Sequence, residues 1–131
     1  MSSEDLHAPR DRLLTATLTH HQAVVSLGEE LEAADWYRQR ADDCDDPALK
    51  DILLHNMREE IEHACMLLEW LRRNVSDWAR QMDTYLYSDG AITGVEAAAT
   101  GQPAAPASSP SRVVAGTVNR FTVGSLKGRG E

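Results

Sequence analysis

The stretch Asp42-Asp43-Cys44-Asp45-Asp46-Pro47 separates two long segments with helical periodicity, and it therefore decides the fold. Asp46 is a good helix cap, because its carboxylate can accept a hydrogen bond from an otherwise unpaired backbone amide. Pro47 suits the first position of a helix, where its missing N–H costs nothing. The stretch predicts a turn that ends at the start of a second helix.

The segments on both sides of this turn are predicted to be long amphipathic helices. Residues 11–43 contain no proline and one glycine, and their apolar residues recur at steps of three and four. The same pattern runs from Pro47 to about Asn74, and residues 75–87 continue it as a kinked extension or a separate short helix that Gly90 ends. We therefore expect an all-α fold, an antiparallel two-helix hairpin with a short C-terminal helix.

Charge and composition narrow the class of protein. Residues 1–96 hold 9 Lys and Arg against 20 Asp and Glu, whereas residues 97–131 hold 4 against 1. An acidic body suits cations and argues against nucleic acid. We expect a cytoplasmic chain with no membrane partner, because no basic start with an apolar run opens it and no stretch approaches 18 apolar residues. Cys44 and Cys65 fit a reducing compartment.

The chain divides into four expected parts: an N-terminal arm (1–10), a helical domain (11–96), a flexible Pro/Ala/Ser-rich linker (97–116) and a C-terminal segment (117–131). A helical domain this small has little core, so a partner copy is a natural expectation. The C-terminal segment carries spaced apolar residues that nothing nearby could bury. It has the character of a docking peptide for another protein, although a tail with chance apolar residues would look the same.

Three residues carry the predicted chemistry: Glu30 on the first helix, and Glu60 and His63 on the second. Residues three apart share a helix face, so Glu60 and His63 can hold one metal ion together. All three lie on apolar stripes, where an ionised and unpaired carboxylate would be costly. With Asp45 at the centre of the turn, Glu30 lies 15 residues before it and Glu60 lies 15 after it, so antiparallel helices place them level.

Carboxylate-bridged di-iron bundles use one Glu from each of two helices and one Glu-x-x-His from each of two others. This chain supplies half of that set, so a second copy is needed, and the hairpin would complete a ferritin-like four-helix bundle by dimerisation. The charges agree, because two ferrous ions bring +4 and Glu30 and Glu60 from two chains bring −4. Oxygen and imidazole ligands suit iron, two per dimer interface; Ca, Mn or Zn can substitute. A Glu-x-x-His spacing also occurs by chance on solvated helix faces.

Several stretches of the chain together are similar to one known family. They are Glu29-Glu30-Leu31-Glu32-Ala33-Ala34-Asp35-Trp36-Tyr37, His55-Asn56, Glu59-Glu60-Ile61-Glu62-His63-Ala64, Leu68-Glu69-Trp70-Leu71-Arg72-Arg73-Asn74 and Phe121-Thr122-Val123-Gly124-Ser125-Leu126-Lys127-Gly128. They resemble the encapsulated ferritins, the two-helix ferritin-like cargo of encapsulin shells, and the last stretch resembles the peptide that targets such cargo to the shell. The resemblance covers nearly the whole chain except the linker.

This resemblance implies a ferroxidase inside an encapsulin nanocompartment that stores the iron mineral. It implies dimers joined by the di-iron centre and a homodecamer built as a ring of five dimers. By the same resemblance Glu30, Glu60 and His63 are the di-iron ligands, with Tyr37 close to the iron. Glu29, Glu32 and Trp36 resemble a metal entry site, and helix spacing puts these three on one face. Without the resemblance, Glu29 and Glu32 could be a solvated face, and the two aromatic residues could be ordinary packing.

Other histidines and other functions remain open. His20 and His21 are adjacent and point about 100° apart, so they cannot hold one ion together. His55 lies two turns from His63 and fits packing or an entry channel. The main alternative function is a non-catalytic helical adaptor or structural metal-binding cargo protein. A rubrerythrin-like peroxide scavenger is a third, less favoured because the sequence has no Cys-x-x-Cys module.

Overall fold

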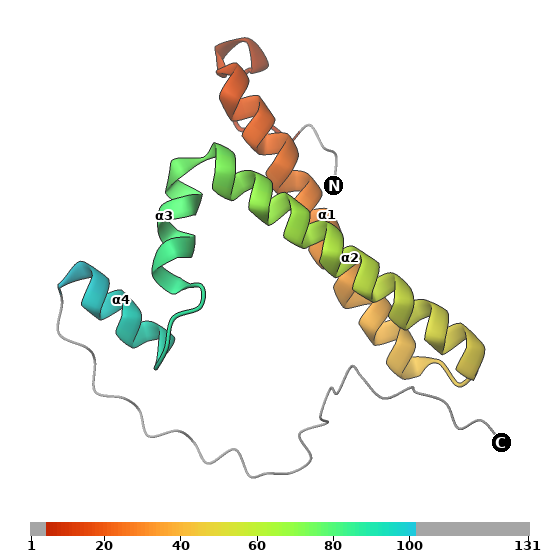
Figure 1. The fold of residues 1–131 in the computed structure, drawn as a ribbon. Helices are drawn as coiled ribbons and strands as arrows, with labels where there is room; N and C mark the ends of the chain where they lie inside the picture. The colour runs from red at the N-terminus through yellow and green to blue at the C-terminus, as the bar shows by residue number, and fades with distance from the viewer. Residues whose placement is uncertain (1–4, 102–131) are drawn as a thin grey trace. The chain divides into compact units, whose positions relative to one another are not determined.

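The computed structural model describes residues 5–101, and these residues form helices with no strand among them (Figure 1). A 3-10 turn spans Arg10–Arg12 and is followed by α1 (Thr15–Asp43), α2 (Pro47–Asn74), α3 (Ser76–Tyr85) and α4 (Ile92–Thr100). The chain divides after Ser88 into two compact units, so α4 is described separately from α1 to α3. The all-α class predicted from the sequence is confirmed.

The helices α1 and α2 run side by side as an antiparallel hairpin (Figure 1). The turn between them forms as expected: Asp46 caps α2, its Oδ1 accepting a hydrogen bond of 2.7 Å from the Leu49 amide, and Pro47 is the first helical residue. α2 ends at Asn74, the predicted residue. Val75 alone has extended backbone between α2 and α3, so residues 76–85 form a separate helix and not a kinked extension.

The observed helix ends differ from the expected ones at three places. α1 begins at Thr15, not near Asp11, because Leu13 and Leu14 have extended backbone after the 3-10 turn. α3 ends at Tyr85, before Gly90. α4 was not expected, and it continues four residues into the segment expected to be linker before Gly101, at φ +70°, ends it. Three successive alanines explain this extension, since alanine is the strongest helix former. The rest of the linker and segment 117–131 lie outside the described residues.

The core of the hairpin is small. Four buried residues form it, and four partly buried residues pack against them: Ala23, Leu27, Ala64 and Leu71, with Leu67, Leu68, Val75 and Trp78. Many apolar side chains stay exposed, among them Leu31 at 55%, Ile52 at 56% and Met66 at 58%. A single hairpin cannot bury both faces of its helices, so these side chains are available to a partner. Within residues 5–101, no helix is long and apolar enough to cross a membrane.

Replacing Asp46 with alanine is expected to lower the free energy of unfolding by about 1 kcal/mol, because the Leu49 amide loses its acceptor at the start of α2. Urea denaturation at fixed protein concentration measures the change. Asp45→Ala is the matched control, since it removes a charge from the same turn without touching this hydrogen bond. Equal losses in the two variants would show that the cap has no special role.

Candidate metal centre

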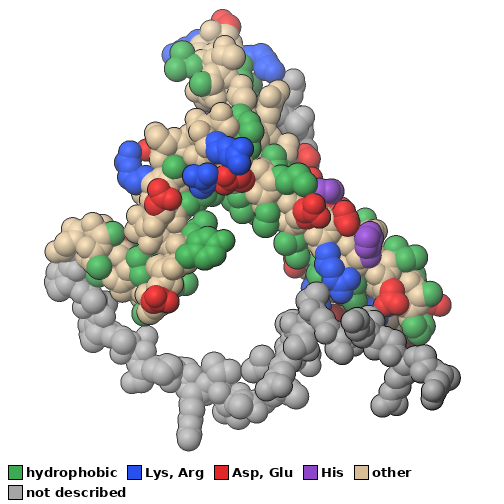
Figure 2. Space-filling model, viewed as in Figure 1, with side chains coloured by type: hydrophobic (Ala, Val, Ile, Leu, Met, Phe, Trp, Pro, Cys, Tyr) green, Lys and Arg blue, Asp and Glu red, His purple; other side chains and the backbone are tan. Residues whose placement is uncertain are grey.

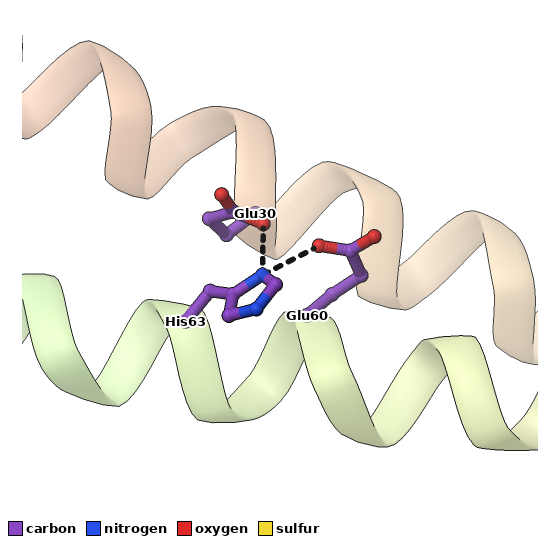
Figure 3. A group of neighbouring side chains, drawn as sticks. All are labelled: Glu30, Glu60 and His63. Atoms are coloured by element: carbon purple, nitrogen blue, oxygen red, sulfur yellow. Dashed lines mark hydrogen bonds and ion pairs between the residues drawn. The ribbon is translucent and has the colours of Figure 1, made fainter.

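The three predicted ligands meet between the two long helices. Glu30 projects from α1, and Glu60 and His63 project from successive turns of α2 toward it (Figure 3). His63 Nδ1 lies 3.6 Å from a Glu30 oxygen and 3.3 Å from a Glu60 oxygen. Their ligand atoms lie within 4.8 Å of one another, close enough for one metal ion to contact all three. Glu30 and Glu60 thus lie level with each other across the hairpin, as the distance of each from the turn predicted.

The cluster is open on one side. The side chains of Glu30 and Glu60 are 26% and 22% exposed, and that of His63 is 45% exposed. The expectation that these carboxylates point into a core is met only in part, because one hairpin covers only one side of them. Figure 2 shows histidine and acidic side chains together on the visible face of the hairpin.

His63 lies on an exposed apolar face of α2. Ile52 is 11 residues before it and Trp70 is 7 after it, close to three and two whole helical turns. Ile52 is 56% exposed and Trp70 is 37% exposed. Exposed apolar side chains therefore lie on the same face of α2 as the histidine, and a partner that covered this face would also close the cluster.

The two carboxylates of the cluster shift each other's pKa in opposite directions. Their hydrogen bond raises the pKa of Glu30 and lowers that of Glu60. Burial lowers the pKa of His63, but the Glu60 hydrogen bond and both carboxylate charges outweigh it and raise the pKa above 6.5. Protonated His63 therefore stabilises the metal-free fold below pH 6.5, and this contribution is lost as pH rises through the folded-state pKa.

Metal binding is expected to weaken as pH falls below the raised pKa of His63, by about tenfold per pH unit, because the imidazole must lose its proton before it can bind a metal. Anaerobic calorimetric titration with Zn(II), a redox-silent probe, measures this slope. His63→Gln should flatten it, whereas His55→Gln, an exposed histidine on the same helix, should leave it unchanged. An unchanged slope in His63→Gln would contradict the assignment.

The residues predicted for metal entry do not join this cluster. Glu29 lines a cavity of about 360 Å³ beside α1, together with Leu6 and Arg10 of the N-terminal arm. Glu32 is exposed, and the ligand cluster found among residues 5–101 contains neither carboxylate. Trp36 is 48% exposed, consistent with a surface position. The entry site therefore stays a prediction.

Arg40 is a neighbour of the predicted aromatic residues that the sequence analysis missed. Its guanidinium carbon lies 5.9 Å from the ring centre of Trp36 and 5.5 Å from that of Tyr37, within the range of cation–π contacts. The available signal was spacing, because residues three and four apart on a helix are neighbours. His55 pairs with Glu59 at 3.7 Å and stays exposed, outside the cluster.

A helical hairpin with a Glu on one helix and a Glu-x-x-His on the other defines a ferritin-like helical protein with a candidate carboxylate–histidine metal site. Comparison with known proteins makes this specific: the model of the EncFtn-like family matches residues 5–89. The chain belongs to this family of encapsulated ferritin-like proteins, as its sequence led us to expect.

Similarity to individual proteins supports this family membership. The encapsulated ferritin-like protein of Rhodospirillum rubrum is 46% identical over 127 residues, which cover 97% of this chain and 91% of that protein. A ferritin-like protein of Thermotoga maritima is 42% identical over 99 residues, covering 76% of this chain and 87% of that protein. A crystal structure of a Nitrosomonas europaea protein superposes with a TM-score of 0.65 at 44% identity, over 68% of this chain and 98% of the other.

Proposed function

We propose that this protein is a ferroxidase that oxidises Fe(II) to Fe(III) at a di-iron centre shared by two copies of the chain. The observation that carries the proposal is the convergence of Glu30, Glu60 and His63 within 4.8 Å, on a cluster that is open on one side. Iron is the substrate of this reaction, and family membership supports a ferritin-like role for the site.

Two copies are needed because one chain supplies two carboxylates and one imidazole. A pair of metal ions in a carboxylate-bridged bundle takes four Glu and two His, which a two-fold axis provides. Four carboxylates from two chains also balance the +4 charge of two ferrous ions. The exposed apolar face around His63, with Ile52 and Trp70, gives the second copy a surface to cover.

The residues of the chain have distinct roles in this proposal. Glu30 and Glu60 bind the ferrous ions as carboxylates and His63 binds as a neutral imidazole, so any proton that these groups carry is released on binding. Each Fe(II) loses one electron, and dioxygen or peroxide accepts the electrons together with protons from solvent. Glu29, Glu32 and Trp36 form the outer entry site, and Tyr37 lies close to the iron.

Storage of the ferric product belongs to a surrounding shell. An open two-helix hairpin encloses no space for a mineral, so we propose that the protein works as cargo of an encapsulin nanocompartment in the cytoplasm. Segment 117–131 is the targeting peptide, and dimers assemble further into a ring of five. The name of the Rhodospirillum rubrum relative, an encapsulated protein, supports this arrangement.

An aerobic assay of ferrous oxidation tests the activity, with oxygen uptake followed in parallel. The proposal expects ferric product and oxygen uptake that both depend on added Fe(II). A non-catalytic adaptor predicts the reverse: assembly that survives chelation, and no iron-dependent oxygen uptake. Assembly that survives chelation, without iron-dependent oxygen uptake, would refute the ferroxidase proposal.

A further inference from the structure

A side-chain hydrogen bond links α3 to α1. The indole Nε1–H of Trp78 on α3 donates to Nε2 of His20 on α1 over 3.0 Å, and the two ring centres lie 6.5 Å apart at 44°. The two residues are 58 positions apart in the chain, and both are partly buried. His20 is ten residues from Glu30, so this contact is separate from the candidate metal centre.

The direction of this hydrogen bond fixes the protonation state of His20. An indole N–H can only donate, so His20 Nε2 must carry a lone pair and the neutral ring must hold its proton on Nδ1. An imidazolium has N–H groups on both nitrogens and cannot accept. Protonation of His20 therefore removes this bond and sets two donors against each other.

The rest of α3 is weakly attached. No residue of α3 is fully buried, and no side chain caps its N-terminus. Trp78 packs against the hydrophobic core cluster, so its ring holds the helix in place together with the His20 bond. A change at His20 therefore acts on one of the few contacts that position α3.

Among the described residues that line the groove beside His20, one carries a charge. His20 lines an open groove of about 810 Å³ where α1, α2 and α3 meet. The residues that α1 and α2 contribute to the groove are uncharged, among them Thr19, Trp70 and Asn74, and α3 contributes Asp77. The Asp77 carboxylate lies 3.5 Å from the Arg80 guanidinium. Asp77 is thus the charged residue among those that line the groove.

We propose that the His20–Trp78 hydrogen bond is a pH-sensitive link that holds α3 against the hairpin at neutral pH and releases it on acidification. The proposal is independent of the ferroxidase activity.

Hydrogen exchange of the full-length protein tests this, read by mass spectrometry on peptides covering residues 76–85. Between pH 7.5 and 5.5, where most Asp and Glu stay ionised, protection of α3 should fall about fivefold after correction for the intrinsic rate, as expected for the loss of one hydrogen bond. His20→Gln keeps an acceptor at both pH values and should stay protected, whereas His20→Leu has none and should be less protected at both.

His21→Gln is the matched control, because it removes the adjacent histidine, which points about 100° away, and should keep the wild-type response. Circular dichroism is used to check that each variant is helical. Three results would overturn the proposal: equal protection of wild-type α3 at the two pH values, a wild-type pH response in His20→Gln, or full protection in His20→Leu.

Discussion

Replacing Glu60 with glutamine is expected to lower the rate of ferrous oxidation by about 100-fold or more, since altering even the groups that support metal ligands typically costs 10- to 100-fold. Glutamine keeps the size of the side chain but removes its charge. The charge matters because Glu60 is one of the two carboxylates of the cluster, and in the proposed pair of chains its copy is lost as well. Stopped-flow absorbance of the ferric product measures the rate.

Glu62→Gln is the control for this variant. Glu62 lies two residues further along α2, is exposed, and points about 160° away from the Glu60 face. It should retain a rate within about twofold of wild type, as a surface substitution away from the site does. Equal rates in wild type and Glu60→Gln would show that Glu60 is not a ligand, and equal losses in both variants would show only a general effect of charge.

Deleting residues 117–131 is expected to abolish loading into an encapsulin shell while leaving ferrous oxidation unchanged. The segment carries the apolar residues that suit a docking peptide, and in the sequence it is separate from the residues that supply the candidate ligands. Co-expression with the shell protein, followed by purification of shells and quantification of the cargo inside, measures loading.

A chain lacking residues 103–112 serves as the control for the tail deletion, because it shortens the linker and keeps the segment. It should load normally, since in our proposal the linker contributes length and not recognition. Normal loading of the tail deletion would refute the targeting role. Loss of oxidation in the same variant would show that the tail also supports the helical unit.

The turn and the register of the two helices could be predicted from sequence because they depend on local chemistry. Asp46 and Pro47 act within one helical turn, and an antiparallel hairpin of regular helices then fixes which residues face each other. This is why Glu30 and Glu60 were found at the same level. The start of α1 was not predicted, because the extended backbone at Leu14 leaves no periodic signal.

Contacts that depend on the direction of side chains could not be predicted from the sequence. The link from His20 to Trp78 joins residues 58 positions apart, across the change in backbone direction at Val75. The exposure of the His63 side chain could not be predicted either, because it depends on how much of α2 the single helix α1 can cover. Residues 97–100 were misread because their composition suits both a linker and a helix.

The central claim is that the metal centre is shared, and analytical ultracentrifugation of anaerobic protein with and without Fe(II), combined with a count of bound iron, tests it most directly. The account predicts that Fe(II) promotes species containing an even number of chains, with one iron bound per chain and therefore two per pair. Tight binding of Fe(II) to a species with the 14.5 kDa mass of one chain, without association, would contradict it.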